Sequence, residues 1–302
     1  MHASISEKGP GKSRTWRVID VIQWAEEYFK SRNFESPRLE IEWLLRDILD
    51  CSRVDIYMRF EEPLSNIQLE KLKDGVKRRL KHEPLQYITG NTEFYGLKFH
   101  VNPNVLIPRP ETERLVDAAI HSLRPQESSL ILDVGTGSGC IAIVLAKEFK
   151  SSKILAMDVT DEALVVAKQN AELNDVTNIE FIKQDFLVDF EMAEKVDLLV
   201  SNPPYVTAEE LTETLPSVKD FEPRIALTDG SDGMTFYKRI AEIAPKLLKS
   251  EAHIFMEAGR GSQPEKVTKL FKAAHYVHVD IIQDYNGDYR VIHVQYSESS
   301  NE

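Results

Sequence analysis

The sequence lacks long hydrophobic runs. None of its apolar stretches approaches the roughly 18 continuous residues that suggest a membrane-spanning helix. The polar residues 1–14 also lack the apolar core of a signal peptide. We therefore expect a disordered leader over 1–14 and a cytoplasmic protein that does not enter a membrane.

Cysteine is scarce. The chain has two cysteines, Cys51 and Cys140, and they do not show the spacing of a metal site. They are predicted to be reduced, buried thiols rather than a disulfide. His275 and His278 are interpreted as residues of a strand surface, so no metal is expected.

Basic charge is also in short supply. Lysine and arginine number 37 against 49 aspartates and glutamates, which gives a net charge of −12. Proteins that bind a nucleic-acid backbone usually present a basic face, so direct nucleic-acid binding is not expected. An apolar content of 42% is that of an ordinary globular protein, and the chain is long enough for one large and one smaller core.

The N-terminal part, residues 15–84, is predicted to be a helical domain. Apolar residues recur at helical spacing from Trp16 to Phe29. Ser36 and Pro37 resemble the cap and first-turn proline of a second helix, and a third is expected over 66–81. Because these helices carry no recognisable chemistry, we interpret the domain as a substrate-docking unit.

Residues 85–110 are predicted to link two domains. Residues 93–101 alternate around Gly96 and indicate a β-hairpin. Residues 107–110 are expected to be turn or extended, because proline disfavours helix at and before itself.

The remaining part, residues 111–302, alternates short apolar strands with amphipathic helices, which predicts a parallel sheet covered on both faces. The expected strands are 130–134, 153–158, 179–184, 196–201 and 252–257, and the expected helices are 139–149, 161–173, 233–249 and 263–273. Two further strands, 275–282 and 289–295, are predicted to form a hairpin through Asn286-Gly287. This α/β arrangement resembles the Rossmann-like, seven-stranded S-adenosylmethionine-dependent methyltransferase domain.

A glycine-rich turn follows the first strand of this sheet. Asp133 is followed by Gly-x-Gly-x-Gly and then by a helix. Dinucleotide-binding loops share such glycines but use Gly-x-Gly-x-x-Gly to hold a pyrophosphate, so the turn alone is only moderately specific. A carboxylate 19 residues beyond Gly139, at Asp158, suits the ribose hydroxyls of an adenosine. By resemblance to the methyltransferase fold, the residues predicted to bind S-adenosyl-L-methionine are Gly135, Thr136, Gly137, Ser138, Gly139, Asp158, Asp185, Phe186 and Asn202.

A second polar motif, Asn202-Pro203-Pro204-Tyr205, directly follows the apolar strand 196–201. Two prolines stiffen the turn, so the Asn202 side chain and the Pro203 carbonyl can both accept hydrogen bonds from one NH₂ group. Tyr205 offers an aromatic face to a planar target. We therefore predict that Asn202, Pro203 and Tyr205 are catalytic and that all four residues bind the substrate. The motif itself leaves amide and adenine nitrogen open as targets.

The chain resembles the release factor glutamine methyltransferase family. The resemblance lies in the stretches 86–90, 93–96, 107–113, 133–139, 202–205 and 222–227. It implies that the substrate is the side-chain N5 of the glutamine in the Gly-Gly-Gln motif of peptide-chain release factors, and that the N-terminal helices hold this partner. The segment that best distinguishes this family is Pro-Arg-Pro-Glu-Thr-Glu. Its arginine, Arg109, is a candidate for substrate binding.

Three other readings compete with that function. A ribosomal-protein glutamine methyltransferase is expected to differ around 108–111. An adenine-N6 nucleic-acid methyltransferase would share the Asn202 motif but fits the acidic charge poorly. A cofactor-binding scaffold without activity would not need that motif.

Overall fold

The computed structural model describes residues 15–123, 128–276 and 278–297. The leader predicted over 1–14 lies outside them. The described part of the chain forms two compact units, one ending at Gly90 and the other beginning at Asn91. Each unit has its own hydrophobic core, and each is described separately below.

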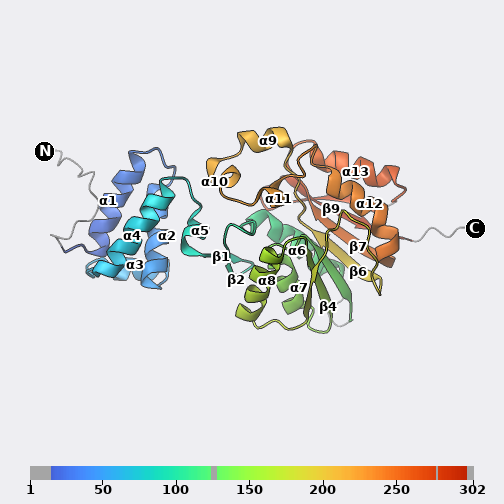
Figure 1. The fold of residues 1–302 in the computed structure, drawn as a ribbon, viewed down its shortest axis with the longest axis horizontal. Helices are drawn as coiled ribbons and strands as arrows, with labels where there is room; N and C mark the ends of the chain where they lie inside the picture. The colour runs from blue at the N-terminus through green and yellow to red at the C-terminus, as the bar shows by residue number, and fades with distance from the viewer. Residues whose placement is uncertain (1–14, 124–127, 277, 298–302) are drawn as a thin grey trace, which may run out of the picture. The chain divides into compact units, whose positions relative to one another are not determined.

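The first unit is a small helical bundle (Figure 1). Its helices are α1 (Val18–Lys30), α2 (Pro37–Leu49), α3 (Arg53–Met58), α4 (Asn66–Arg79) and α5 (Leu85–Thr89). Pro37 occupies the first turn of α2 as predicted, whereas Ser36 makes no side-chain capping bond. The helices α3 and α5 were not predicted, because six and five residues are too short for a clear periodic pattern.

The core of this bundle is formed by the apolar faces of α1, α2 and α4. Phe29, Ile41 and Leu72 are all fully buried in it. Two arginines at the end of α4 are paired within this unit: Arg78 forms a salt bridge with Glu83, and Arg79 forms one with Glu40 of α2.

The second unit begins with the predicted hairpin. Its strands β1 (Asn91–Phe94) and β2 (Leu97–His100) pair antiparallel, with a turn at Tyr95-Gly96. The following segment corrects one prediction. Pro110 is not in a turn but is the first residue of helix α6 (Pro110–Ser122). The N–H group of a first helical residue has no partner within the helix, so a proline there breaks no hydrogen bond.

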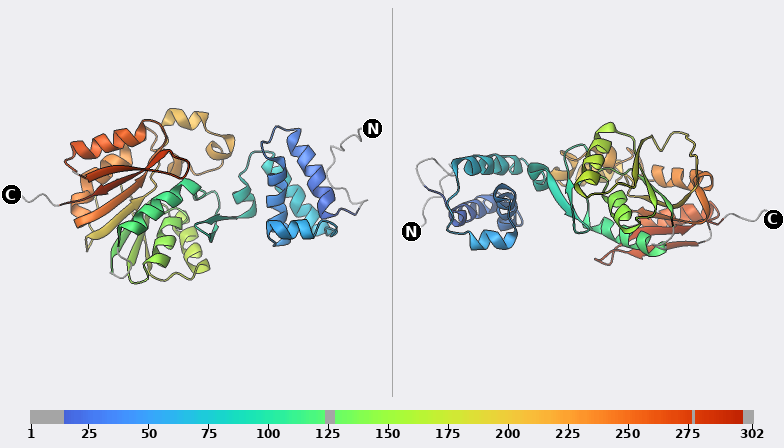
Figure 2. Two further views of the ribbon diagram at one scale, coloured as in Figure 1. Left: turned by 180° about the vertical axis from the view of Figure 1, so that it is seen from behind. Right: turned by 90° about the horizontal axis from the view of Figure 1, so that it is seen from below.

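A seven-stranded sheet forms the centre of the second unit. The strands are β3 (Leu130–Val134), β4 (Lys153–Asp158), β5 (Ile179–Lys183), β6 (Val196–Ser201), β7 (Leu248–Glu257), β8 (His278–Gln283) and β9 (Tyr289–Gln295). Their order is β5-β4-β3-β6-β7-β9-β8, and β9 is the one strand of this sheet that runs opposite to the other six. The C-terminal hairpin therefore continues the main sheet, as the red strands of Figure 2 show.

Helices cover both faces of this sheet. The α6, α7 (Cys140–Glu148) and α8 (Asp161–Leu173) helices lie on one face, and α12 (Thr235–Leu247) and α13 (Gln263–Ala273) lie on the other. Neighbouring strand residues alternate between the two cores, as Ile131 and Leu132 do. This confirms the predicted α/β fold class.

Three short helices that the sequence analysis did not predict lie between β6 and α12. They are α9 (Ala208–Glu213), α10 (Pro216–Lys219) and α11 (Arg224–Leu227). The remaining boundaries differ from prediction by a few residues, except that β7 begins four residues early, at Leu248. The two cysteines are free as predicted, but each is partly rather than fully buried. Among the described residues, no helix is long and apolar enough to cross a membrane.

Candidate active site

The sheet topology brings the two predicted functional loops together. Strands β3 and β6 are neighbours at the centre of the sheet, and Val134 pairs with Ser201 at their carboxyl ends. The Ser201 hydroxyl also donates to the Val134 carbonyl at 2.8 Å. The glycine loop after β3 and the Asn202 loop after β6 therefore leave the sheet side by side, where open α/β sheets bind ligands.

The glycine loop (Gly135–Gly139) is shaped by its own backbone. All three glycines have positive φ, between 54° and 80°. The backbone N–H groups of Gly135 and Thr136 donate to the Met157 carbonyl at 2.9 Å, and that of Gly137 donates to Asp158 Oδ2 at 2.9 Å. These bonds hold the loop against the end of β4.

A cavity of about 290 Å³ opens between the two loops. Most of the residues predicted to bind cofactor or substrate line it, together with the neighbouring Phe236. These are Arg109, Gly135, Thr136, Gly137, Ser138, Asp158, Asp185, Phe186, Asn202, Pro203 and Pro204.

Gly139 does not line this cavity. It caps α7, and a Cβ atom there would lie 3.1 Å from the Ala167 Cβ and 3.2 Å from Ile143 Cδ1. Its absence of a side chain lets α7 begin close against α8. The structure thus gives Gly139 a packing role beside the loop.

The cavity fits S-adenosyl-L-methionine. Asp158 uses one hydrogen bond on Oδ2 and two on Oδ1, from Gly137 and Thr160, so lone pairs remain for ribose hydroxyls. Phe186 is buried at the cavity wall and stacks with Phe236 at an interplanar angle of 7°. These two groups offer the polar and the flat apolar surface that an adenosine needs.

Asp133 is a buried acid just before the glycine loop. It is fully buried, its Oδ2 accepts from the Thr136 hydroxyl at 2.7 Å, and its Oδ1 has no hydrogen-bond partner among the described residues. Burial raises the pKa of this carboxyl to about 7. A titratable acid is therefore buried just before the glycine loop.

The Asn202 loop (Asn202–Tyr205) is held from outside. Gln263 donates to the Tyr205 carbonyl at 2.9 Å, and the Tyr205 hydroxyl donates to Glu257 Oε1 at 3.1 Å. A Cβ at Gly233 would lie only 2.3 Å from the Tyr205 carbonyl oxygen. The loop is therefore packed against the segment between α11 and α12 as well as against the end of β7.

A second cavity of about 170 Å³ is also lined by residues of this loop. Asn202, Pro203 and Arg109 line both cavities, whereas Tyr205 lines only the smaller one. Burial raises the pKa of the Tyr205 phenol above its usual value. The Asn202–Pro203 turn therefore contributes to the wall of both cavities.

Arg109 connects two segments that surround this wall. Its guanidinium forms a salt bridge with Glu222, whose side chain is buried and whose other carboxylate oxygen accepts from the Ile107 N–H at 3.2 Å. The segments 107–113 and 222–227 are thus tied together, and both contribute lining residues. Among the described residues there is no cluster of three or more potential ligands that could hold a metal.

Sequence reasoning missed three residues of this site: Thr112, Glu257 and Arg290. All three are buried and hydrogen-bond with Asn202 or Tyr205. Glu257 ends an apolar strand and Arg290 lies within one, so charge in a buried strand was the available signal.

Comparisons with known proteins agree with this geometry. Residues 20–90 match the family model described as the PrmC N-terminal domain, and residues 126–294 match a methyltransferase domain. A release factor glutamine methyltransferase of Geobacter sulfurreducens is 39% identical over 93% of this chain and 97% of its own. Proteins with the same name from Fusobacterium nucleatum (36%, covering 94% and 80%) and Bacillus subtilis (37%, covering 91% and 96%) are similarly close.

Proposed function

The chain belongs to the release factor glutamine methyltransferase family, and we propose that it methylates the side-chain N5 of the glutamine in the Gly-Gly-Gln motif of peptide-chain release factors. It is an S-adenosyl-L-methionine-dependent protein glutamine methyltransferase. The Gly-Gly-Gln target, the cytoplasmic location and the absence of direct nucleic-acid contact are part of the proposal.

One observation carries the choice of an NH₂ target. Asn202 and Pro203 line both the larger and the smaller cavity. Among the described residues, no hydrogen bond is made to Asn202 Oδ1 or to the Pro203 carbonyl oxygen. Two free acceptors on a rigid turn match the two hydrogens of a carboxamide NH₂ group.

The chemistry needs such a pair of acceptors. An amide nitrogen is a weak nucleophile because its lone pair is delocalised into the carbonyl group. Asn202 Oδ1 and the Pro203 carbonyl can hold both hydrogens and favour the pyramidal nitrogen that attack requires. When bound, the cofactor supplies an electrophilic methyl group. The protein's part is to hold the nitrogen in line and to exclude water.

The residues in the two compartments have separate tasks in this proposal. Gly135–Ser138, Asp158, Asp185 and Phe186 hold the cofactor in the larger cavity. Asn202, Pro203, Pro204, Tyr205 and Arg109 receive the glutamine from the smaller one, where the Tyr205 ring forms part of the lining.

Mass spectrometry of release factor incubated with enzyme and cofactor tests the function. We expect one added methyl group on the Gly-Gly-Gln glutamine, and none on a release factor in which that glutamine is replaced by asparagine. Parallel incubations with ribosomal protein and with DNA cover the rival substrates. Methylation of either of these, with unmodified release factor, would refute the proposal.

A further inference from the structure

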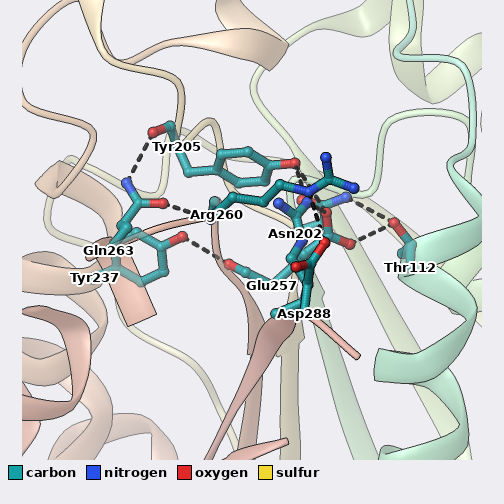
Figure 3. A network of polar contacts seen from close by, with 10 residues as sticks. Thr112, Asn202, Tyr205, Tyr237, Glu257, Arg260, Gln263 and Asp288 are labelled. Atoms are coloured by element: carbon teal, nitrogen blue, oxygen red, sulfur yellow. Dashed lines mark hydrogen bonds and ion pairs between the residues drawn. The ribbon is translucent and has the colours of Figure 1, made fainter. Parts of the chain in front are cut away.

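A chain of buried hydrogen bonds leads away from Asn202. Asn202 Nδ2 donates to Thr112 Oγ1 at 3.1 Å, and the Thr112 hydroxyl donates to Glu257 Oε2 at 2.6 Å. The two bonds connect the loop after β6 to α6 and to the end of β7 (Figure 3). Thr112 and Glu257 are 2% and 0% exposed, so water does not compete for these contacts.

The far end of this series of hydrogen bonds is held by the guanidinium group of Arg290. Arg290 Nη2 donates to Glu257 Oε1 at 3.1 Å and to the Tyr205 hydroxyl at 2.8 Å. The Tyr205 hydroxyl donates to the same Glu257 oxygen. The two carboxylate oxygens thus have separate partners: Oε1 faces Arg290 and Tyr205, and Oε2 faces Thr112.

The direction of each bond follows from the number of protons available. A carboxylate can only accept, so Thr112 must spend its single hydroxyl proton on Glu257. Its oxygen then has only lone pairs to offer Asn202, and the Asn202 atom that faces it must be the NH₂ group. This argument assigns the orientation of the amide from chemistry.

We propose that Thr112 and Glu257 are positioning residues, which lock the Asn202 side-chain amide with its NH₂ group turned inward and its Oδ1 turned to the substrate. The inference rests on the proposed function, in which Oδ1 accepts a hydrogen of the glutamine amide. An inverted Asn202 would present a donor to another donor, and the substrate NH₂ would be repelled.

Glu257→Gln is the sharpest test, because it reverses the chain without changing its shape. Arg290 and Tyr205 require an acceptor, so the glutamine oxygen must face them. Its NH₂ group then donates to Thr112, which frees the Thr112 hydroxyl proton to bond to Asn202 and favours the inverted amide. We expect kcat on release factor to fall about a hundredfold, as when one catalytic hydrogen bond is lost, with KM for the cofactor little changed.

Thr112→Val removes the link while keeping its volume. The amide is then free rather than inverted, so the expected fall in kcat is smaller, about tenfold. Thr112→Ser restores the hydroxyl and should recover most of the activity. Thr268→Val, which removes a half-buried hydroxyl that donates to the Pro264 carbonyl on α13, is the matched control and should retain wild-type kcat.

The double variant Thr112→Val/Glu257→Gln separates a relay from two independent defects. Once the hydroxyl is gone, Glu257→Gln can no longer invert Asn202. The double variant should therefore be no worse than Glu257→Gln alone. Multiplied losses, or wild-type kcat in Thr112→Val, would overturn the proposal.

Nuclear magnetic resonance provides a readout without turnover. In protein labelled with ¹⁵N-asparagine, the Asn202 side-chain NH₂ signal is identified by its absence in Asn202→Asp. It should move in Thr112→Val and Glu257→Gln and stay in Thr112→Ser, and an unmoved signal in the first two would refute the relay. A wild-type enzyme that leaves release factor unmodified would instead refute the proposed function, while this signal still decides the orientation.

Discussion

The glycine loop and the Asn202 loop lie side by side but are built in different ways. The glycine loop owes its shape to three glycines of its own and to backbone bonds with β4. The Asn202 loop contains no glycine and is held by side chains from α6, β7, β9 and α13. The shape of the glycine loop is therefore encoded locally. The Asn202 loop depends on hydrogen bonds between residues as far apart in the sequence as Thr112 and Glu257, which are separated by 145 positions.

The largest effect is expected from removing the chemical group of the second loop. Asn202→Ala should lower turnover of release factor about a hundredfold to a thousandfold, because one of the two acceptors for the substrate NH₂ is lost. Cofactor affinity, measured by calorimetry, should stay near that of the wild type. Turnover close to normal would remove Asn202 from the mechanism.

Breaking the support of the Asn202 loop from a distance should cost somewhat less. The Cβ of Gly233→Ala would collide with the Tyr205 carbonyl, so the loop must shift. We expect kcat to fall about a hundredfold, as small misplacements of reacting groups do. Steady-state kinetics with saturating cofactor measures this.

Gly230→Ala is the matched control for this change. Gly230 has nearly the same φ, 75° against 70°, but a Cβ there meets nothing within 4 Å. Both variants carry the same backbone strain, and only Gly233→Ala adds the collision. Equal losses in the two variants would show that strain rather than loop position is responsible.

Changes in the glycine loop should affect cofactor binding rather than turnover. Asp158→Ala should weaken cofactor binding roughly tenfold to hundredfold, since it removes a charged acceptor that also anchors Gly137. At saturating cofactor, kcat should be largely retained. Asp161→Ala, an exposed aspartate at the start of α8 that does not line the cavity, serves as the control in calorimetry. Equal affinity of the Asp158 and Asp161 variants would contradict the assignment.

The smallest expected effect is on protein stability, and it comes from Asp133, the buried acid before the glycine loop. The folded-state pKa of Asp133 is raised to about 7, above the roughly 3.9 of an unfolded chain. The folded protein then holds the extra proton between these values. Stability should decrease as pH rises from 5 to 7, by at most about 1.4 kcal/mol per pH unit, and level off above 7.

Asp133→Asn isolates this contribution, because asparagine does not titrate. Urea unfolding at pH 5, 6, 7 and 8 should show the wild type losing stability relative to the variant as pH rises. A difference that is constant across this range would mean that Asp133 titrates with an ordinary pKa.

The same contrast explains what could be read from the sequence. Asp133, Asp158 and the glycines are predictable because a strand, a turn and the next strand lie close together in the chain. Thr112 gives no such signal, because its role depends on Glu257, which ends a strand much farther along the sequence. The strands of the sheet could be predicted from their apolar residues, whereas α9, α10 and α11 are too short for their periodicity to be recognised.

Helix α6 shows where a local rule was applied too broadly. Pro110 was expected to mark a turn because proline interrupts helices. At the first position of a helix it has the opposite meaning, and the acidic residues Glu111 and Glu113 in the first turn support a start there. That start is what places Thr112 under the Asn202 loop.

The pairing of Val134 with Ser201 has a consequence for how this enzyme could be redesigned. The spacing of the two loops is set by the ladder between β3 and β6, not by the residues 206–233 that follow the second loop. Segments there can be exchanged to admit a differently shaped acceptor while the donor side keeps its alignment. The sheet therefore fixes the position of both loops while the segment that borders the substrate side is replaced, provided that the contacts of Gly233 and Gln263 with Tyr205 are left in place.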